Sequence, residues 1–167
     1  MIAVRAVVLL ALALGVQVGL ARLWPTSVRY LDVMVLPVLW YATTRSQRSA
    51  ILVGCFAGLS YDAWFRAGVF GMGGFIKTFL GWAAGAVGSR IDLNPQINRF
   101  AAAFLFTWLQ SPLELGLRRL LDQITEPARP LEWTARAAVT AVAVVVVFPI
   151  LERTWGESRD SRYPGRG

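Results

Sequence analysis

Three charged side chains lie within an otherwise apolar, glycine-rich stretch of the sequence, residues 58–88. Arg66 belongs to the short connection between two apolar segments, whereas Asp62 and Lys77 lie within those segments. Asp62 and Lys77 are an acid and a base of the kind that can form an ion pair, relay a proton or contact a substrate. A charge at the centre of a bilayer costs about 3 kcal/mol or more, so such residues need partners within a helix bundle. We therefore expect Asp62 and Lys77 to pair with each other, either as a packing device or as a relay or substrate contact.

The spacing of glycines predicts that both charges face neighbouring helices. One stripe has a member every four residues: Ala50, Gly54, Gly58 and Asp62. The next segment has a stripe with spacings of three and four: Gly74, Lys77, Gly81, Gly85 and Gly88. Small residues at these spacings share one helix face and allow two backbones to approach closely. The two segments are therefore expected to pack through their glycine faces.

The elements that must position these residues are predicted to be membrane helices. Hydrophobic residues make up 56% of the 167 residues and charged residues 16%, against about 25% charged in soluble domains. Mean hydropathy is +0.51. Six segments approach the ~20 residues needed to cross a bilayer: 3–24, 30–43, 49–65, 70–88, 100–117 and 134–151. We expect an all-α bundle of six transmembrane helices over residues 1–152, with a basic cytoplasmic tail over 153–167.

The distribution of basic residues predicts the orientation. Six spans place both termini and the second and fourth loops on one side, with nine arginines there and seven on the other. Because arginine and lysine are retained in the cytoplasm, both termini are expected to be cytoplasmic. The first segment is too long for a signal peptide core and is expected to stay as a helix. Trp40 and Tyr41 are expected at the inner interface, as in an aromatic belt.

Residue types that carry most enzyme chemistry are scarce. The chain has no histidine and one cysteine, Cys55, so we expect no catalytic set, metal site or cofactor. Gly71 to Gly74 could bind an anion at a helix start, although glycines there also permit a tight turn. The net charge of +7 does not require nucleic acid, since cytoplasmic retention alone places arginines in the tail.

The fifth segment is expected to continue beyond the bilayer as an amphipathic helix. Pro112 predicts a kink, and Glu114 and Arg118 are spaced for an i,i+4 ion pair. An apolar stripe follows on one face: Leu113, Leu117, Leu120, Leu121 and Ile124. We expect this stripe to lie at the outer interface and to contact a partner.

These features together resemble the MreD family of bacterial rod shape-determining membrane proteins. The resemblance is carried by Gly54-x-x-x-Gly58-x-x-x-Asp62, then Gly68-x-x-Gly71-x-Gly73-Gly74, and an apolar span that ends in Gly81-Trp82-x-x-Gly85. This pattern covers about residues 50 to 90, while length and span number fit over the whole chain. Lys77 departs from the common family pattern. The resemblance implies a fold related to the S components of energy-coupling factor transporters.

The resemblance also implies a non-enzymatic role in the cell-elongation machinery that builds side-wall peptidoglycan. Expected partners are MreC directly, the MreB filament, the RodA glycosyltransferase, its class B penicillin-binding transpeptidase, and lipids of the bacterial inner membrane. It implies that Asp62 and the motif glycines carry the architecture. The alternative is a substrate-binding membrane subunit of a small-solute, vitamin-type transporter, with Asp62 and Lys77 as ligands.

Overall fold

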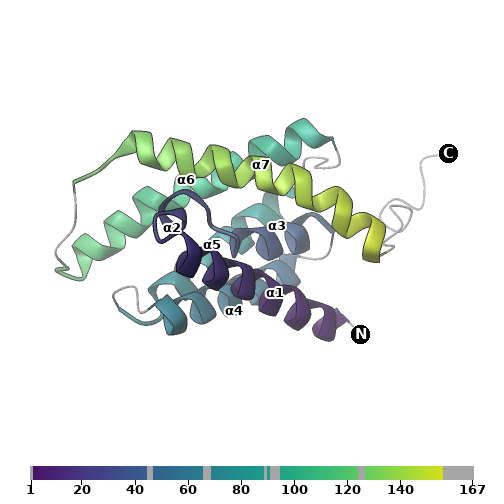
Figure 1. The fold of residues 1–167 in the computed structure, drawn as a ribbon, viewed down its shortest axis with the longest axis horizontal. Coiled ribbons are helices and arrows are strands. Elements are labelled where there is room, and N and C mark those ends of the chain that lie inside the picture. Colours follow the sequence, from purple (N-terminus) through teal and green to yellow (C-terminus); the bar gives the residue numbers. More distant parts are fainter. Residues whose placement is uncertain are drawn as a thin grey trace.

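The computed structural model describes residues 2–44, 47–65, 69–88, 90, 95–123 and 127–155. These residues form helices and no strand, so the all-α prediction is confirmed (Figure 1). The helices are α1 (Ile2–Leu23), α2 (Ser27–Tyr30), α3 (Val35–Thr44), α4 (Gln47–Phe65), α5 (Met72–Gly88), α6 (Gln96–Leu120) and α7 (Pro130–Trp155). Figure 1 shows α6 and α7 as a long hairpin over one side of the bundle, with α1, α4 and α5 on the other.

Helices α4 and α5 form a closely packed hairpin through their glycines. A Cβ atom added at Gly54, Gly58 or Gly81 would come within 3.0 Å of the backbone carbonyl group of Lys77, Gly73 or Ala50, respectively. Real Cβ atoms do not approach a backbone this closely, so these positions require glycine for the observed packing. The two glycine stripes therefore face each other, as their spacing predicts.

The glycines at the two ends of this hairpin meet side chains. An added Cβ would meet Leu59 at Gly74 and Gln47 at Gly85. The Gln47 amide also donates a hydrogen bond to the Trp82 carbonyl oxygen over 3.2 Å, which ties the start of α4 to α5.

The predicted second span, residues 30–43, is not one helix. The short helix α2 ends at Tyr30, a non-helical segment follows, and α3 has 10 residues. At ~1.5 Å per residue α3 rises ~15 Å, about half of a bilayer core. Eight of its residues are buried, so α3 is an internal helix. Trp40 is 2% exposed and contacts the Phe148 ring edge-on at 5.2 Å, which corrects the expectation that Trp40 and Tyr41 lie at an interface.

Helix α6 ends earlier than the sequence suggested. It runs without interruption through Pro112 and stops at Leu120. Asp122 then has a left-handed backbone (φ 51°), and the Gln123 N–H donates to the Arg118 carbonyl oxygen. This C-terminal turn satisfies carbonyl groups of the last helical turn and ends the helix. The helix therefore continues past the predicted span end at residue 117, as expected, but only to Leu120. Residues 121–123 are not helical, which corrects that part of the prediction, and Ile124 lies outside the described residues.

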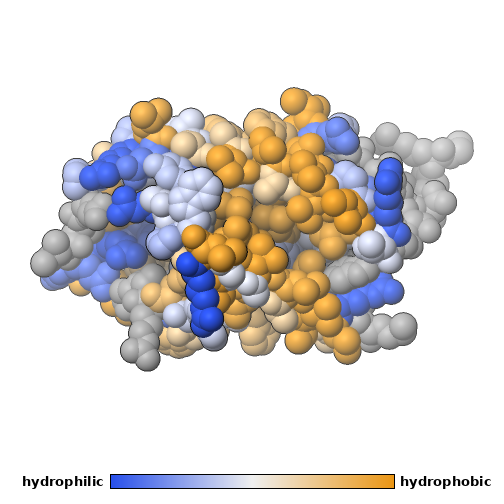
Figure 2. Space-filling view, in the orientation of Figure 1, coloured by the Kyte–Doolittle hydropathy of each residue, from blue (hydrophilic) through white to orange (hydrophobic). Residues whose placement is uncertain are grey.

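Two of the described helices are long and apolar enough to cross a membrane, Ala3–Leu23 and Pro130–Thr154. Figure 2 shows hydrophobic residues over the middle of this face and hydrophilic residues toward its two ends. The core between the helices is apolar and includes Met34, Trp40, Ala57, Ile76, Ala103, Ala141, Val144 and Phe148. Most of the expected basic tail, residues 156–167, lies outside the described residues.

Candidate functional site

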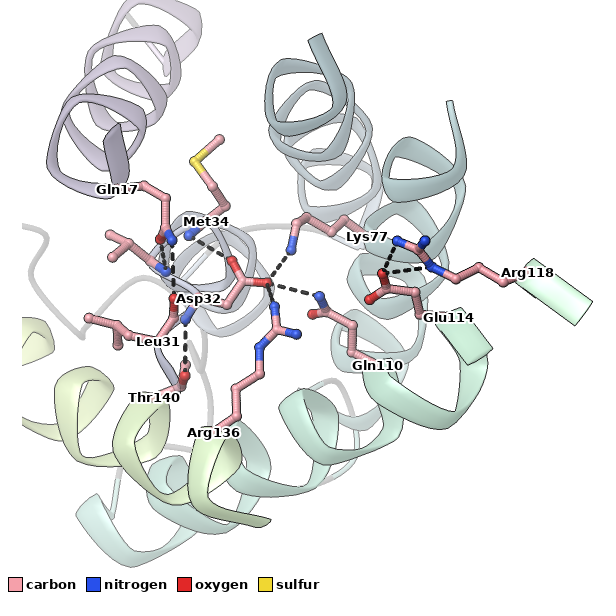
Figure 3. Close-up of polar contacts among 11 residues, drawn as sticks. Gln17, Leu31, Asp32, Met34, Lys77, Gln110, Glu114, Arg118, Arg136 and Thr140 are labelled. Atoms are coloured by element: carbon pink, nitrogen blue, oxygen red, sulfur yellow. Dashed lines mark hydrogen bonds and ion pairs between the residues drawn. The ribbon is translucent and has the colours of Figure 1, made fainter. Parts of the chain in front are cut away.

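A buried carboxylate, Asp32, is the centre of a polar cluster inside the bundle. Its Oδ2 atom accepts hydrogen bonds from Lys77 Nζ at 2.5 Å, Gln110 Nε2 at 2.9 Å and Arg136 Nη2 at 3.1 Å. Figure 3 shows the three donors converging on Asp32 from α5, α6 and α7. The Asp32 side chain is fully buried, Lys77 is 2% exposed and Arg136 is 15% exposed. We call these four residues the Asp32 centre.

The non-helical segment before α3 holds Asp32 in place. Asp32 Oδ1 accepts from the Met34 N–H at 3.1 Å, which satisfies a free donor at the start of α3. The Asp32 N–H donates to Thr140 Oγ1 at 3.3 Å. Gln17 in α1 accepts from the Val33 N–H at 2.7 Å and donates to the Leu31 carbonyl oxygen at 3.1 Å. Buried backbone polar groups that a continuous helix would pair internally are thus paired by side chains of α1 and α7.

Lys77 and Asp62 do not pair with each other, which corrects the sequence expectation. Asp62 Oδ2 accepts from the Gly71 N–H at 3.0 Å and the Gly74 N–H at 3.2 Å, at the start of α5. Free backbone N–H groups and the helix dipole make this position favourable for a carboxylate. Lys77 extends instead to Asp32 and lies over the Tyr61 ring, with Nζ 5.5 Å from the ring centroid.

The contact of Asp62 with the start of α5 accounts for the glycines around it. Gly71 has a φ of 97°, a conformation that favours glycine. A Cβ added at Gly73 would collide with the Asp62 carboxylate. The carboxylate therefore occupies the helix start that the sequence left open as an anion site, and these glycines allow the tight turn and the close approach.

Four buried polar atoms, two in the Asp32 centre and two elsewhere on α6, have no partner among the described residues. They are Gln110 Oε1, Arg136 Nε, Ser111 Oγ and Thr107 Oγ1. Three of these residues lie on one face of α6, which also carries Glu114 at the next turn. Buried polar groups without partners are uncommon in native proteins, so this face of α6 needs a further explanation.

Three further ion pairs join described residues at the ends of the hairpin of α6 and α7, and one of them is the exposed i,i+3 pair of Arg129 and Glu132 at the start of α7. Arg99 Nη2 lies 2.5 Å from Glu152 Oε1, and this pair connects α6 with α7. Glu114 Oε1 accepts from Arg118 Nη2 at 2.8 Å, as the i,i+4 spacing predicts. Glu114 and Arg118 are about one-quarter exposed, so this pair is worth a few tenths of a kcal/mol.

The candidate partner leucines divide into two pairs. Leu113 and Leu117 are partly buried and pack against the core. Leu120 is 83% exposed and Leu121 is 50% exposed. Cys55 is a free, partly exposed cysteine in α4, and the described residues contain no group of three or more metal-ligating side chains.

Sequence reasoning missed the principal member of this site. Neither Asp32 nor Arg136 is among the residues that the sequence analysis singled out. The available signal was a set of single polar residues in apolar runs, Gln17, Asp32 and Gln110, since such residues are usually buried and partnered.

Comparison with family models, with curated proteins and with solved structures gave no match for this chain.

Proposed function

We propose that the chain is a non-enzymatic membrane scaffold of the MreD type, which binds MreC and thereby supports side-wall peptidoglycan synthesis and rod shape. In this proposal it is a multi-pass protein of the bacterial inner membrane with both termini in the cytoplasm. MreB, RodA and the class B penicillin-binding transpeptidase belong to the same elongation complex.

The observation that carries the proposal is the hairpin of α4 and α5. The residues that resemble MreD are the ones that allow the two helices to touch through their backbones, Gly54, Gly58 and Gly81. The motif carboxylate Asp62 caps the second helix of the hairpin through the N–H groups of Gly71 and Gly74. The resemblance thus rests on residues with a defined structural task.

Several features support an embedded, multi-pass arrangement. Helices α1 and α7 have the length and hydropathy of membrane spans, and apolar residues cover the middle of one face of the molecule between polar ends (Figure 2). In Figure 1 the start of α1 and the end of α7 lie at the same end of the bundle, as an even number of crossings requires. We place six crossings in the membrane, with the α2–α3 region as the one that is only partly helical.

A partner surface is available at the end of α6. Leu120 and Leu121 are exposed beside the charged residues Arg119 and Asp122. Exposed leucines with polar neighbours are suited to a protein contact or to the membrane interface. We assign this surface to MreC, and the exposed apolar face of α1 to lipids or to helices of the same complex.

A second candidate function is favoured by the unpartnered buried atoms of the Asp32 centre. A substrate-binding subunit of a small-solute transporter would use such atoms to contact its ligand. In that case Gln110 and Arg136 would be ligands, in place of Asp62, whose carboxylate is occupied by α5. Retention of one vitamin-sized molecule by the purified protein would favour this candidate.

Depletion in the native host tests the scaffold function. We expect rods to become spheres, and wild-type protein supplied in trans to restore them. A variant with Gly58→Leu should fail to restore rod shape, because it separates α4 from α5. The matched control, Gly15→Leu on α1, has no atom within 4 Å of the added Cβ and should restore it. Normal rods after depletion would contradict the proposal.

A further inference from the structure

Arg136 has more hydrogen-bond donors than the described residues use. A guanidinium carries five N–H donors in a planar fork. Its Nη2 donates to Asp32 Oδ2 at 3.1 Å, while its Nε is buried and without a partner among the described residues. The side chain is 15% exposed, so water reaches only a small part of it. A buried guanidinium with an unused N–H group can donate a hydrogen bond to a second acceptor.

Two hydroxyl groups on α6 are also free to donate. The helical threonines Thr78, Thr134 and Thr154 each donate to the carbonyl oxygen four residues earlier, as is usual for hydroxyls in helices. Thr107 and Ser111 do not, although they are 0% and 7% exposed. They lie one turn apart on the face of α6 that carries Gln110.

The charges of the Asp32 centre favour an anion over a neutral ligand. The single carboxylate of Asp32 faces two cations, Lys77 and Arg136. The nearby Glu114 is paired with Arg118, and Asp62 is held by backbone N–H groups of α5. The centre therefore has one more positive charge than its own carboxylate neutralises. A buried excess charge is costly unless an opposite charge accompanies it.

From these observations we infer that the centre binds one phosphate-type oxyanion, held by the guanidinium of Arg136 and by the hydroxyls of Ser111 and Thr107. A planar guanidinium matches the oxygens of a phosphate in two-point contact. The free Gln110 Oε1 accepts from an O–H group of the ligand, which both hydrogen phosphate and a hydroxylated lipid headgroup carry. The inference goes beyond the scaffold function and does not depend on MreC.

The position of Arg136 explains how such an anion reaches the site. Arg136 lies six residues after Pro130, the first residue of α7, which is ~9 Å along the helix. The phosphate has two possible sources: a phospholipid headgroup at that depth, or free phosphate from the adjacent solution.

The test uses the full chain, purified in a neutral detergent and freed of lipid by exchange. In one arm inorganic phosphate is titrated, and in the other a short-chain phosphatidylglycerol, with native mass spectrometry and calorimetry as readouts. We expect one bound equivalent in at least one arm. Binding in the phosphate arm identifies the free ion as sufficient, and binding in the lipid arm alone identifies the headgroup. Arg136→Lys keeps the charge, loses the fork, and should weaken binding at least tenfold.

Matched variants separate binding from folding. Arg119→Lys makes the same change at an exposed position of α6 and should bind as the wild type does. Ser111→Ala and Thr107→Val should each weaken binding several-fold while the circular dichroism spectrum and elution volume stay unchanged. If neither arm gives a one-to-one complex, or if folded Arg136→Lys binds as tightly as the wild type, the inference is wrong and water occupies these donors.

Discussion

Lys77 Nζ lies 2.5 Å from Asp32 Oδ2, and the two side chains come from segments 45 residues apart. Both are buried. This contact ties α5 to the segment before α3, and Gln110 and Arg136 bring α6 and α7 to the same oxygen. One carboxylate thus connects four parts of the chain.

The pair predicts a specific pattern in a double-mutant cycle. Asp32→Asn or Lys77→Met should each lower the free energy of unfolding by about 3–5 kcal/mol, because one charge stays buried without its partner. The double variant should recover part of this loss. Chemical unfolding in detergent measures the four proteins of the cycle. Additive losses from Asp32→Asn and Lys77→Met would contradict the pairing.

Asp62 supplies the control for that cycle. Because it contacts backbone N–H groups and not Lys77, Asp62→Asn combined with Lys77→Met should give the sum of the single effects. Asp62→Ala should cost about 0.5–2 kcal/mol, as loss of a helix cap does. Asp62→Asn retains an acceptor oxygen and should cost less. If the coupling energy between Asp62 and Lys77 were as large as that between Asp32 and Lys77, the pairing expected from the sequence would be correct and the one in the structure would be contradicted.

Alanine substitutions of glycines should change stability differently between α4 and α5 than on α1. Gly54→Ala and Gly58→Ala should lower the free energy of unfolding by about 1–3 kcal/mol or more, since the new methyl group meets the backbone of α5. Gly15→Ala and Gly19→Ala on α1 meet no atom within 4 Å. They should be neutral or stabilise the helix by up to about 1 kcal/mol. Thermal unfolding of the four variants checks this, and equal effects at all four positions would refute the close packing.

Orientation in the membrane is checked by labelling single cysteines in a Cys55→Ala background. We expect Asp122→Cys, which follows α6, to react with an impermeant thiol reagent in spheroplasts that retain the inner membrane. Arg48→Cys, at the start of α4, should react only after the membrane is opened. Both positions are exposed in the structure, so access within the protein is matched. The reverse pattern would place the termini outside.

Residue spacing along the sequence was sufficient to predict the parts of the fold that depend on which residues share a helix face. The glycine stripes of α4 and α5 predicted which faces meet, because small residues at four-residue spacing permit only close contacts. The Glu114 and Arg118 pair followed from i,i+4 spacing for the same reason.

The Asp32 centre could not be predicted in this way, because its members come from separate helices and their contacts depend on the tertiary arrangement. The break before α3 was missed because hydropathy is continuous through residues 30–43, whereas the backbone is held there by Gln17 and Thr140. The sequence analysis paired Asp62 with Lys77 because it considered charged side chains alone. The free backbone N–H groups at a helix start carry no formal charge and were not considered as partners.

The most direct test of the scaffold function is the capture of MreC by this chain from native membranes in mild detergent, quantified for wild type and two variants. We expect MreC in roughly equal amount with the wild type. Leu120→Glu should reduce the recovered MreC severalfold, while Leu131→Glu, at an equally exposed leucine of α7, should not. If wild-type protein captures no MreC, or if both variants capture it as well as the wild type does, the proposed scaffold function or its assigned surface is contradicted.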